Sequence, residues 1–191
     1  MWFENDNSMK TYIALFRGIN VGGHHVLPMR ELVSLLERLG AEQIKTYIQS
    51  GNAVFRHRDK HAAKLADGIT AVIKKSRGFA PQVLLLDSAD WEKVMALNPF
   101  PEATSDPKHL HLFFLASVPK SPDLDALADI RQDGERFHLG RRVFYLHAPN
   151  GMGRSKLAAR VEPALGVSAT ARNWRTVDKV MALARQIVDA G

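Results

Sequence analysis

The chain has 191 residues, of which 46% are hydrophobic and 24% are charged, and this ordinary globular composition argues against a disordered chain or a fibre. It contains no cysteine, which excludes disulfides, thiolate nucleophiles and cysteine-based zinc sites. The net charge of +6 favours acidic partners such as nucleic acid or phosphorylated metabolites.

The first ten residues, MWFENDNSMK, mix acids, amides and one lysine, and they lack the apolar stretch of a signal peptide. We expect residues 1–10 to be a disordered leader. No apolar run approaches the roughly 18 to 20 residues that a membrane helix needs. The sequence therefore predicts a cytoplasmic protein with no membrane partner, and it does not predict an oligomeric state.

The first half of the chain predicts the order strand, helix, strand, strand, helix, strand. In the first helix, apolar residues recur at three- and four-residue spacing, with Pro28 in its first turn and Gly40 at its end. In chain order the segments are TYIALF at 11–16, PMRELVSLLERLG at 28–40, IKTYIQ at 44–49, NAVFRH at 52–57, HAAKLADGITAVIKK at 61–75 and PQVLLLD at 81–87.

The same order recurs in the second half, after a linking helix at 88–97 and a proline-rich linker at 98–107. Ser121 is expected to cap the helix SPDLDALADI, with Pro122 at its first position. The other segments are HLHLFFLAS at 109–117, RFHLG at 136–140, RVFYLH at 142–147, SKLAARVEPALG at 155–166, VSATARN at 167–173 and TVDKVMALARQIVDA at 176–190. The sequence thus predicts an α+β fold of two fused ferredoxin-like (split βαβ) subdomains, 11–97 and 108–191, plus a C-terminal helix.

Four segments in this order, YIALFRGINVGG, VLPMRELVSLLERLG, TYIQSGNAVF and TARNWRTVDKV, resemble domain-of-unknown-function family 1697. The resemblance runs from about Tyr12 to near the C-terminus. It implies two fused ferredoxin-like subdomains, and it implies no established activity or cofactor. Family members often carry lysine or asparagine after Gly23, where this chain has His24 and His25, so a site there would depend more on pH.

Two polar segments of the first half predict ligand contacts. In FRGINVGGHH, Arg17 and Asn20 follow a strand, in a loop that its glycines loosen and in which backbone N–H groups can approach an anion. In TYIQSGN, strand alternation directs Ile48 to the core and leaves Tyr47 and Gln49 on the other side. Turn chemistry alone explains Gly51 and leaves Gln49 unexplained.

Two polar segments of the second half have a similar character. In NGMGRSKL, Ser155 is expected to cap a helix, and Lys156 in the first turn opposes the helix dipole by roughly 0.3 to 1 kcal/mol unless an anion binds there. In TARNWRT, we expect Trp174 to be a core residue or a stacking wall. Arg172 and Asn173 are the expected ligand contacts, because an arginine can bind phosphate or carboxylate through two parallel hydrogen bonds.

We expect all four segments to border one anion-binding groove between the subdomains. The predicted contacts are Arg17, Asn20, Tyr47, Gln49, Ser50, Asn52, Ser155, Lys156, Arg172, Asn173 and Trp174. An anionic, phosphate-bearing small molecule is the favoured ligand. A nucleic-acid-binding module and a protein-interaction scaffold without catalysis are the alternatives.

The sequence identifies no catalytic residue and no cofactor, and it leaves open whether the protein is an enzyme. His109 and His111 lie on one face of a predicted strand, a spacing that some zinc sites use. A third ligand would have to come from elsewhere in the chain. We therefore expect no metal site.

Overall fold

A computed structural model describes residues 9–189 of the chain. These residues form two compact units: the first is the chain up to Glu92 together with the segment from Lys179 onward, and the second is Lys93–Asp178. Most of the leader expected at 1–10 lies outside the described residues, and Lys10 already begins the first strand.

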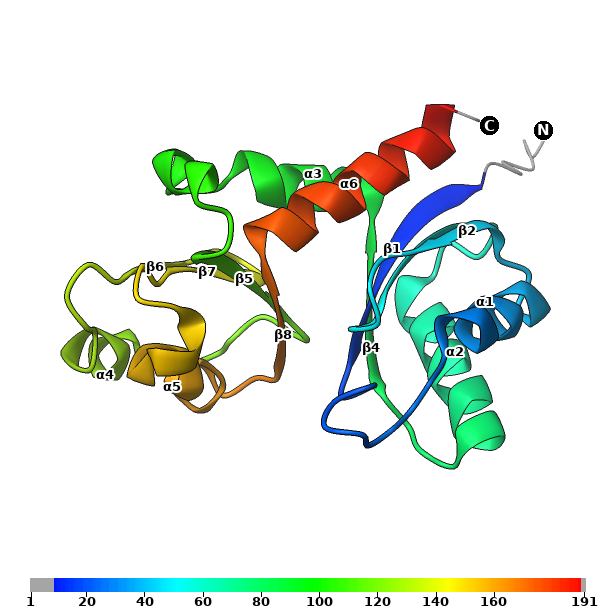
Figure 1. Ribbon diagram of the computed structural model, residues 1–191, viewed down its shortest axis with the longest axis horizontal. Coiled ribbons are helices and arrows are strands. Elements are labelled where there is room, and N and C mark those ends of the chain that lie inside the picture. The colour runs from blue at the N-terminus through cyan, green and yellow to red at the C-terminus, as the bar shows by residue number, and fades with distance from the viewer. Residues whose placement is uncertain (1–8, 190–191) are drawn as a thin grey trace, which may run out of the picture. The chain divides into compact units, whose positions relative to one another are not determined.

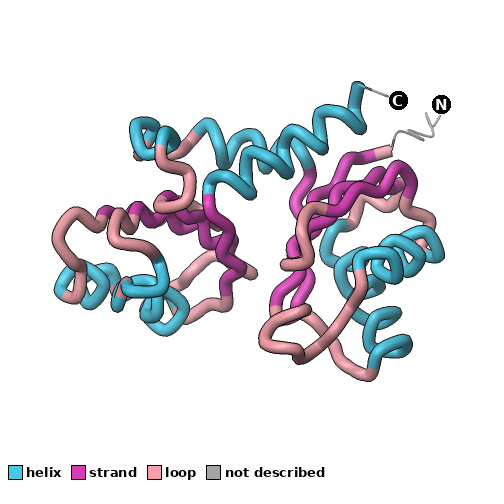
Figure 2. Tube along the Cα trace, viewed as in Figure 1, coloured by secondary structure: helices cyan, strands magenta, loops and turns pink. Residues whose placement is uncertain are grey.

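The first unit contains an antiparallel sheet with the strand order β2-β3-β1-β4, and α1 and α2 cover one of its faces (Figure 1). Its elements are β1 (Lys10–Arg17), α1 (Met29–Arg38), β2 (Glu42–Thr46), β3 (Asn52–His57), α2 (Ala62–Arg77) and β4 (Gln82–Asp87). The connection from β1 to α1 is one of the long pink loops in Figure 2.

The core beneath α1 and α2 follows from strand and helix periodicity. Alternate residues of β1, including Tyr12 and Phe16, are buried on this face of the sheet. Leu32, Leu35 and Leu36 of α1 pack into the same cluster, as their spacing predicts. The sheet and the two helices therefore share one apolar core.

The other face of this sheet is also buried, at Ile13, Leu15 and Val54. Lys45 lies opposite Val54 in the β2–β3 register, and its Nζ donates to Oε1 of Gln186 at 2.8 Å. The segment of α6 within the first unit therefore lies over this face. Its apolar stripe is Val180, Met181, Ala184 and Ile187, all buried.

The second unit repeats the arrangement with the strand order β6-β7-β5-β8, and α4 and α5 cover one face (Figure 1). Its elements are η1 (Pro101–Ser105), β5 (Leu110–Leu115), α4 (Leu124–Asp129), β6 (Arg136–Leu139), β7 (Val143–His147), η2 (Met152–Arg154), α5 (Lys156–Leu165) and β8 (Ala169–Asn173). A helix follows the last strand of each sheet: α3 (Ser88–Ala96) after β4, and α6 (Trp174–Asp189) after β8. The predicted α+β fold with two split βαβ subdomains is confirmed.

Two local predictions are wrong. The strand expected at 44–49 ends at Thr46, and Ile48 takes a φ of 51° and is 52% exposed instead of pointing into the core. The alternation argument fails there because a turn has replaced the strand. The cap of α4 is Asp123, whose carboxylate accepts a hydrogen bond from the backbone N–H of Ala126 at 3.0 Å, and not Ser121.

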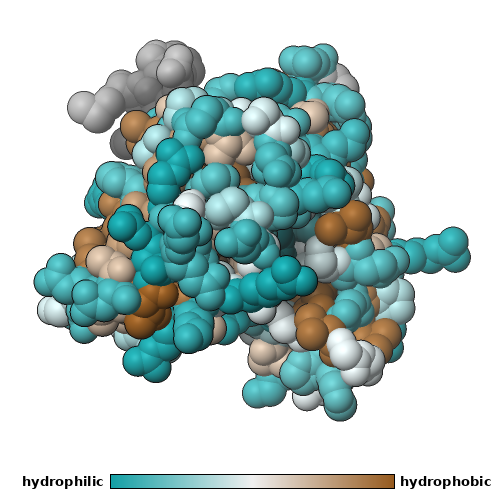
Figure 3. Space-filling view, turned by 60° about the vertical axis from the view of Figure 1, so that its left-hand side comes forward, coloured by the Kyte–Doolittle hydropathy of each residue, from teal (hydrophilic) through white to brown (hydrophobic). Residues whose placement is uncertain are grey.

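The face of the surface drawn in Figure 3 is largely hydrophilic, with apolar side chains in small brown groups. Among residues 9–189, no helix is both long enough and apolar enough to cross a membrane.

Candidate functional site

Residues 20–25, between β1 and α1, form a small hairpin, named here the glycine hairpin. The N–H of His24 donates to the carbonyl of Val21 at 2.9 Å, and these two residues form a β-bridge. Gly22 and Gly23 between them have φ values of +57° and +79°, the signs that a type I′ turn requires. The glycines therefore shape a defined turn, and the expectation that they loosen this loop is wrong.

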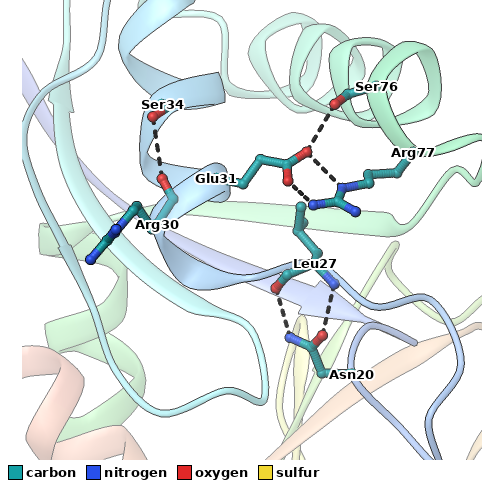
Figure 4. A network of polar contacts seen from close by, with 7 residues as sticks. All are labelled: Asn20, Leu27, Arg30, Glu31, Ser34, Ser76 and Arg77. Atoms are coloured by element: carbon teal, nitrogen blue, oxygen red, sulfur yellow. Dashed lines mark hydrogen bonds and ion pairs between the residues drawn. The ribbon is translucent and has the colours of Figure 1, made fainter.

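Asn20 ties this hairpin to the turn at residues 47–51, named here the 47–51 turn (Figure 4 shows its bonds to Leu27). Its Nδ2 donates to the carbonyl of Leu27 at 3.0 Å and to the carbonyl of Gln49 at 2.8 Å. Its Oδ1 accepts from the N–H of Leu27 at 2.8 Å. Both amide hydrogens of Asn20 are thus used to hold two segments that lie 29 residues apart in the chain.

The 47–51 turn is held from inside by Asn52 and Gly51. Asn52 is fully buried, and its Nδ2 donates to the carbonyl of Tyr47 at 3.1 Å and to Oγ of Ser50 at 3.3 Å. Gly51 has a φ of +80°, and a Cβ placed on it would lie 2.7 Å from Cβ of Phe16. Only glycine fits this position without a clash. In the turn that results, Tyr47 is half-buried and Ser50 is exposed.

His25 is oriented by two contacts. Its ring stacks on Phe79 with the centroids 4.6 Å apart, and its Nδ1 lies 2.9 Å from the carbonyl oxygen of Gly18. A carbonyl can only accept, so Nδ1 carries the proton of the neutral ring. The Nε2 atom is then an acceptor in the neutral ring and a second donor in the protonated ring.

Positive charge predominates around these two segments. Residues 11–30 and 43–58 contain no aspartate or glutamate, and Arg17, His24 and Arg30 are exposed. Glu31, which directly follows the first range, is held by the guanidinium of Arg77 and the hydroxyl of Ser76, and Figure 4 shows the Arg30 side chain directed away from it. Glu42 and Asp59 flank the second range. An anion near the hairpin would therefore meet cations and little opposing charge.

In the second unit, the residues expected to bind an anion have local structural contacts. Ser155 is buried and caps α5, with its Oγ accepting from the N–H of Ala158 at 3.0 Å, as expected. Lys156 is the exposed first residue of that helix. Asn173 caps α6 in the same way, with its Oδ1 accepting from the N–H of Thr176 at 3.0 Å.

Arg172 and Trp174 lie on either side of this cap. Arg172 is half-buried on β8 opposite Leu112 of β5, and its Nη1 donates to the carbonyl of Ala171 at 2.8 Å. Burial lowers the pKa of Arg172 to about 10, a value at which the guanidinium is still charged near neutral pH. Trp174 is the half-buried first residue of α6.

Three histidines lie at one end of the second sheet, where the central strand β5 begins and the central strand β7 ends. His109 precedes β5, and its Nδ1 lies 2.7 Å from Oδ2 of Asp106, which lowers the pKa of that carboxyl. His111 lies opposite Asn173, and burial lowers the pKa of its imidazole. The Nδ1 atom of His111 is buried without a hydrogen-bond partner in the part of the chain that the structure describes.

His147 is the last residue of β7 and lies at the same end of the sheet, opposite Leu110 of β5. Its Nδ1 lies 3.3 Å from Nη2 of Arg136, which can only donate, so this nitrogen is unprotonated. Burial lowers the pKa of His147, and the charge of Arg136 lowers it further. Arg136 also pairs with Glu102 and stacks over Phe100. Within residues 9–189, no three His, Asp or Glu side chains are grouped so that they could hold a metal ion.

Hydrogen bonds join several of the predicted residues in the first unit, and those of the second unit lie at the starts of two helices. Those at one end of the first unit are Arg17, Asn20, Tyr47, Gln49, Ser50 and Asn52. Those around the starts of α5 and α6 in the second unit are Ser155, Lys156, Arg172, Asn173 and Trp174. A single groove shared by the two groups stays a prediction. Sequence reasoning missed Leu27 and Phe79. Leu27 bonds to Asn20 through its backbone, which no side-chain pattern marks, and Phe79 stacks on His25, which is distant in the chain.

Residues 9–145 match the family described as "Protein of unknown function (DUF1697)", and the chain belongs to this family. The predicted resemblance is confirmed, although the segment TARNWRTVDKV lies beyond the matched residues. Among solved structures, the chain is similar to the conserved bacterial protein SP0830 from Streptococcus pneumoniae, with 24% identity, a TM-score of 0.70, and coverage of 93% of this chain and 99% of that one. That likeness concerns the fold. No curated protein matches this chain.

Proposed function

We propose that this member of the DUF1697 family binds an anionic, phosphate-bearing small molecule at the end of its first unit, where the glycine hairpin meets the 47–51 turn. One observation carries the proposal: the amide of Asn20 holds together two segments that are free of acids and rich in donors. A site fixed before binding loses less conformational entropy when a ligand arrives.

The roles of the side chains follow from their hydrogen bonds. Asn20 and Asn52 are positioning residues, because their amide hydrogens are already donated to the protein. Arg17 is exposed and supplies positive charge, and the exposed imidazole of His24 supplies an N–H donor. A guanidinium can bind two phosphate oxygens at once, so Arg17 is the residue expected to matter most.

Calorimetric titration of the full chain with inorganic phosphate and with pyrophosphate tests this proposal. We expect Arg17→Ala to weaken pyrophosphate binding about tenfold, the loss expected for one hydrogen bond between charged groups. Arg38→Ala, which removes an exposed arginine from the other end of α1, is the matched control and leaves binding unchanged. Equal binding by the two variants, or no binding of either anion by the unmodified chain, contradicts the proposal.

A single-stranded oligonucleotide serves as the competing ligand. If the protein binds the oligonucleotide with a steep dependence on salt and does not bind pyrophosphate, the nucleic-acid alternative is correct instead. If pyrophosphate binds and the oligonucleotide binds no more tightly per phosphate, the small-molecule proposal is supported.

A further inference from the structure

Three large aliphatic side chains stand exposed beside the Asn20 hydrogen bonds. They are Val21, 66% exposed, Val26, 52% exposed, and Ile48, 52% exposed. Each is the chain neighbour of a residue in those bonds: Val21 of Asn20, Val26 of Leu27, and Ile48 of Gln49. The hydrogen bonds that join the two segments therefore bring the backbone at these three residues together, and the three residues are named here the aliphatic tip.

Ile48 is unfavourable there for two independent reasons. Its φ of 51° lies in the left-handed region, which a β-branched residue adopts only under strain. Its side chain also gains only part of the free energy that a core isoleucine gains from burial, because the residue is 52% exposed. Glycine or asparagine would fit this backbone better, so the folding of the 47–51 turn does not account for an isoleucine.

Arg17 ends β1, and two histidines lie on the same β1–α1 connection as two of these aliphatic residues, Val21 and Val26. Val21 and His24 form a β-bridge, so their side chains are cross-strand neighbours. His25, also in this hairpin, stacks on Phe79, and its Nδ1 lies against the carbonyl of Gly18. Arg17 directly precedes Gly18 in the chain. The surface is thus amphipathic, with aliphatic groups and positive charge held together by the same backbone.

From this juxtaposition we infer that the phosphate-bearing ligand has an apolar body next to its phosphate, as in an alkyl phosphate ester. The phosphate binds the cations and the apolar body covers Val21, Val26 and Ile48. This inference rests on the proposed function and specifies its substrate class. An ester is favoured over a bare phosphate because only an ester removes the aliphatic tip from water.

The test compares n-hexyl phosphate with inorganic phosphate on the full chain. We expect n-hexyl phosphate to bind more tightly, by about fourfold for each methylene that is buried. Ile48→Gly is expected to reduce this preference about tenfold, to leave the affinity for inorganic phosphate unchanged, and not to lower the melting temperature. Val21→Ser is expected to act in the same direction.

Val118→Ser is the matched control, because Val118 is 46% exposed in the corresponding connection of the second unit, between β5 and α4. We expect it to leave both affinities unchanged. Equal binding of the two ligands by the unmodified chain overturns this inference and spares the proposed function, whereas binding of neither ligand overturns both. If Ile48→Gly weakens both ligands equally, Ile48 merely shapes the turn and the inference is wrong.

A phosphate ester can be soluble or part of a lipid, and sedimentation with phosphatidylcholine vesicles containing phosphatidic acid distinguishes the two sources. Hexyl phosphate binding together with vesicle binding assigns the site to a lipid phosphate. Hexyl phosphate binding without vesicle binding assigns it to a soluble ester. Vesicle binding that Ile48→Gly and Val21→Ser leave unchanged contradicts a role for the aliphatic tip.

Discussion

The two units make the same kind of loop contact with chemically different side chains. In the first unit, the neutral amide of Asn20, from the β1–α1 connection, donates to the carbonyl of Gln49 in the β2–β3 turn. In the second unit, the guanidinium of Arg142, from the β6–β7 hairpin, donates to the carbonyl of Ala116 at 2.7 Å, directly after β5. The second unit thus fastens its loops with a cation, and the first fastens them with a neutral amide.

This difference suggests where to look for ligand binding in a repeated fold. Two units with the same strand order need not share a site, because the side chain that closes the loops decides which charges are engaged within the protein. Substitutions at matching places in the two units should therefore change stability and phosphate binding to different extents.

The largest expected effect comes from the turn glycines. Gly51→Ala forces a φ of +80° on an L residue and brings a Cβ within 2.7 Å of Phe16, which we expect to destabilise the protein by about 3 kcal/mol. Gly140→Ala, in the hairpin of the second unit, places its Cβ 3.2 Å from a side-chain methyl of Val143, so we expect a loss of only about 1 kcal/mol. Urea unfolding measures both, and equal losses contradict this difference between the turns.

The next effect concerns the fastening side chains. Asn20→Leu removes three hydrogen bonds and places a leucine at a φ of 54°, and we expect a loss of about 2 to 3 kcal/mol and faster amide hydrogen exchange at Leu27. Arg142→Met removes two bonds to carbonyls, and we expect a smaller loss, about 1 kcal/mol.

Phosphate binding distinguishes these two variants further. Asn20→Leu is expected to abolish it and Arg142→Met to preserve it, because Asn20 positions the proposed site and Arg142 does not. Loss of phosphate binding in Arg142→Met would mean that the second unit contributes to the site.

Relief of strain gives a smaller effect with the opposite sign. Ile48→Asn places a residue that tolerates positive φ where isoleucine has a φ of 51°, and we expect the free energy of unfolding to rise by about 1 kcal/mol. Thermal unfolding measures the change. A lower melting temperature would show that Ile48 stabilises the turn and would remove the strain argument for the aliphatic tip.

The smallest expected effect is a pH dependence that belongs to the second unit. Burial lowers the pKa of His111 and of His147, so the unfolded chain binds protons more readily than the folded one at these sites. Above the ordinary histidine pKa of about 6.5 both histidines are neutral in the folded and the unfolded chain, and they cost no stability. As the pH falls below that value, protons bind preferentially to the unfolded chain and the free energy of unfolding decreases. Around His147, the charges of Arg136 and His109 act in the same direction, and those of Glu102 and Asp106 oppose it.

His111→Leu removes one of these groups without adding a charge. We expect it to flatten the decline in the free energy of unfolding between about pH 7.5 and pH 5.5. His138→Gln, at an exposed position on β6, is the control and keeps the unmodified slope. If His111→Leu also kept that slope, His111 would not contribute to the pH dependence.

Periodicity predicted most of the fold because it is a local property. The leucine spacing of α1 and the apolar run TYIALF in β1 appear in residues that are neighbours in the chain, and the structure forms and buries both elements as expected. The cap of α4 was misplaced because Ser121, Pro122 and Asp123 all suit a helix start, and only the backbone geometry selects Asp123.

The candidate site was predicted less completely, because its geometry depends on distant contacts. The sequence identified Asn20 as a polar loop residue, but it could not show that the amide bonds to Gln49, whose carbonyl is part of a turn. Ile48 was assigned to the core because a short strand and a turn with positive φ look alike in a sequence without glycine at that position. Because Ile48 lies in a turn and not in a strand, its side chain is exposed and belongs to the aliphatic tip.

The most direct test of the central claim is a titration of the isotopically labelled full chain with inorganic phosphate, followed through the backbone amide resonances. The account predicts that the amides of residues 18–27 and 47–51 shift together with one dissociation constant, and that those of 116–123 and 140–142 do not shift. Shifts confined to the second unit, or no shifts at all, would contradict it.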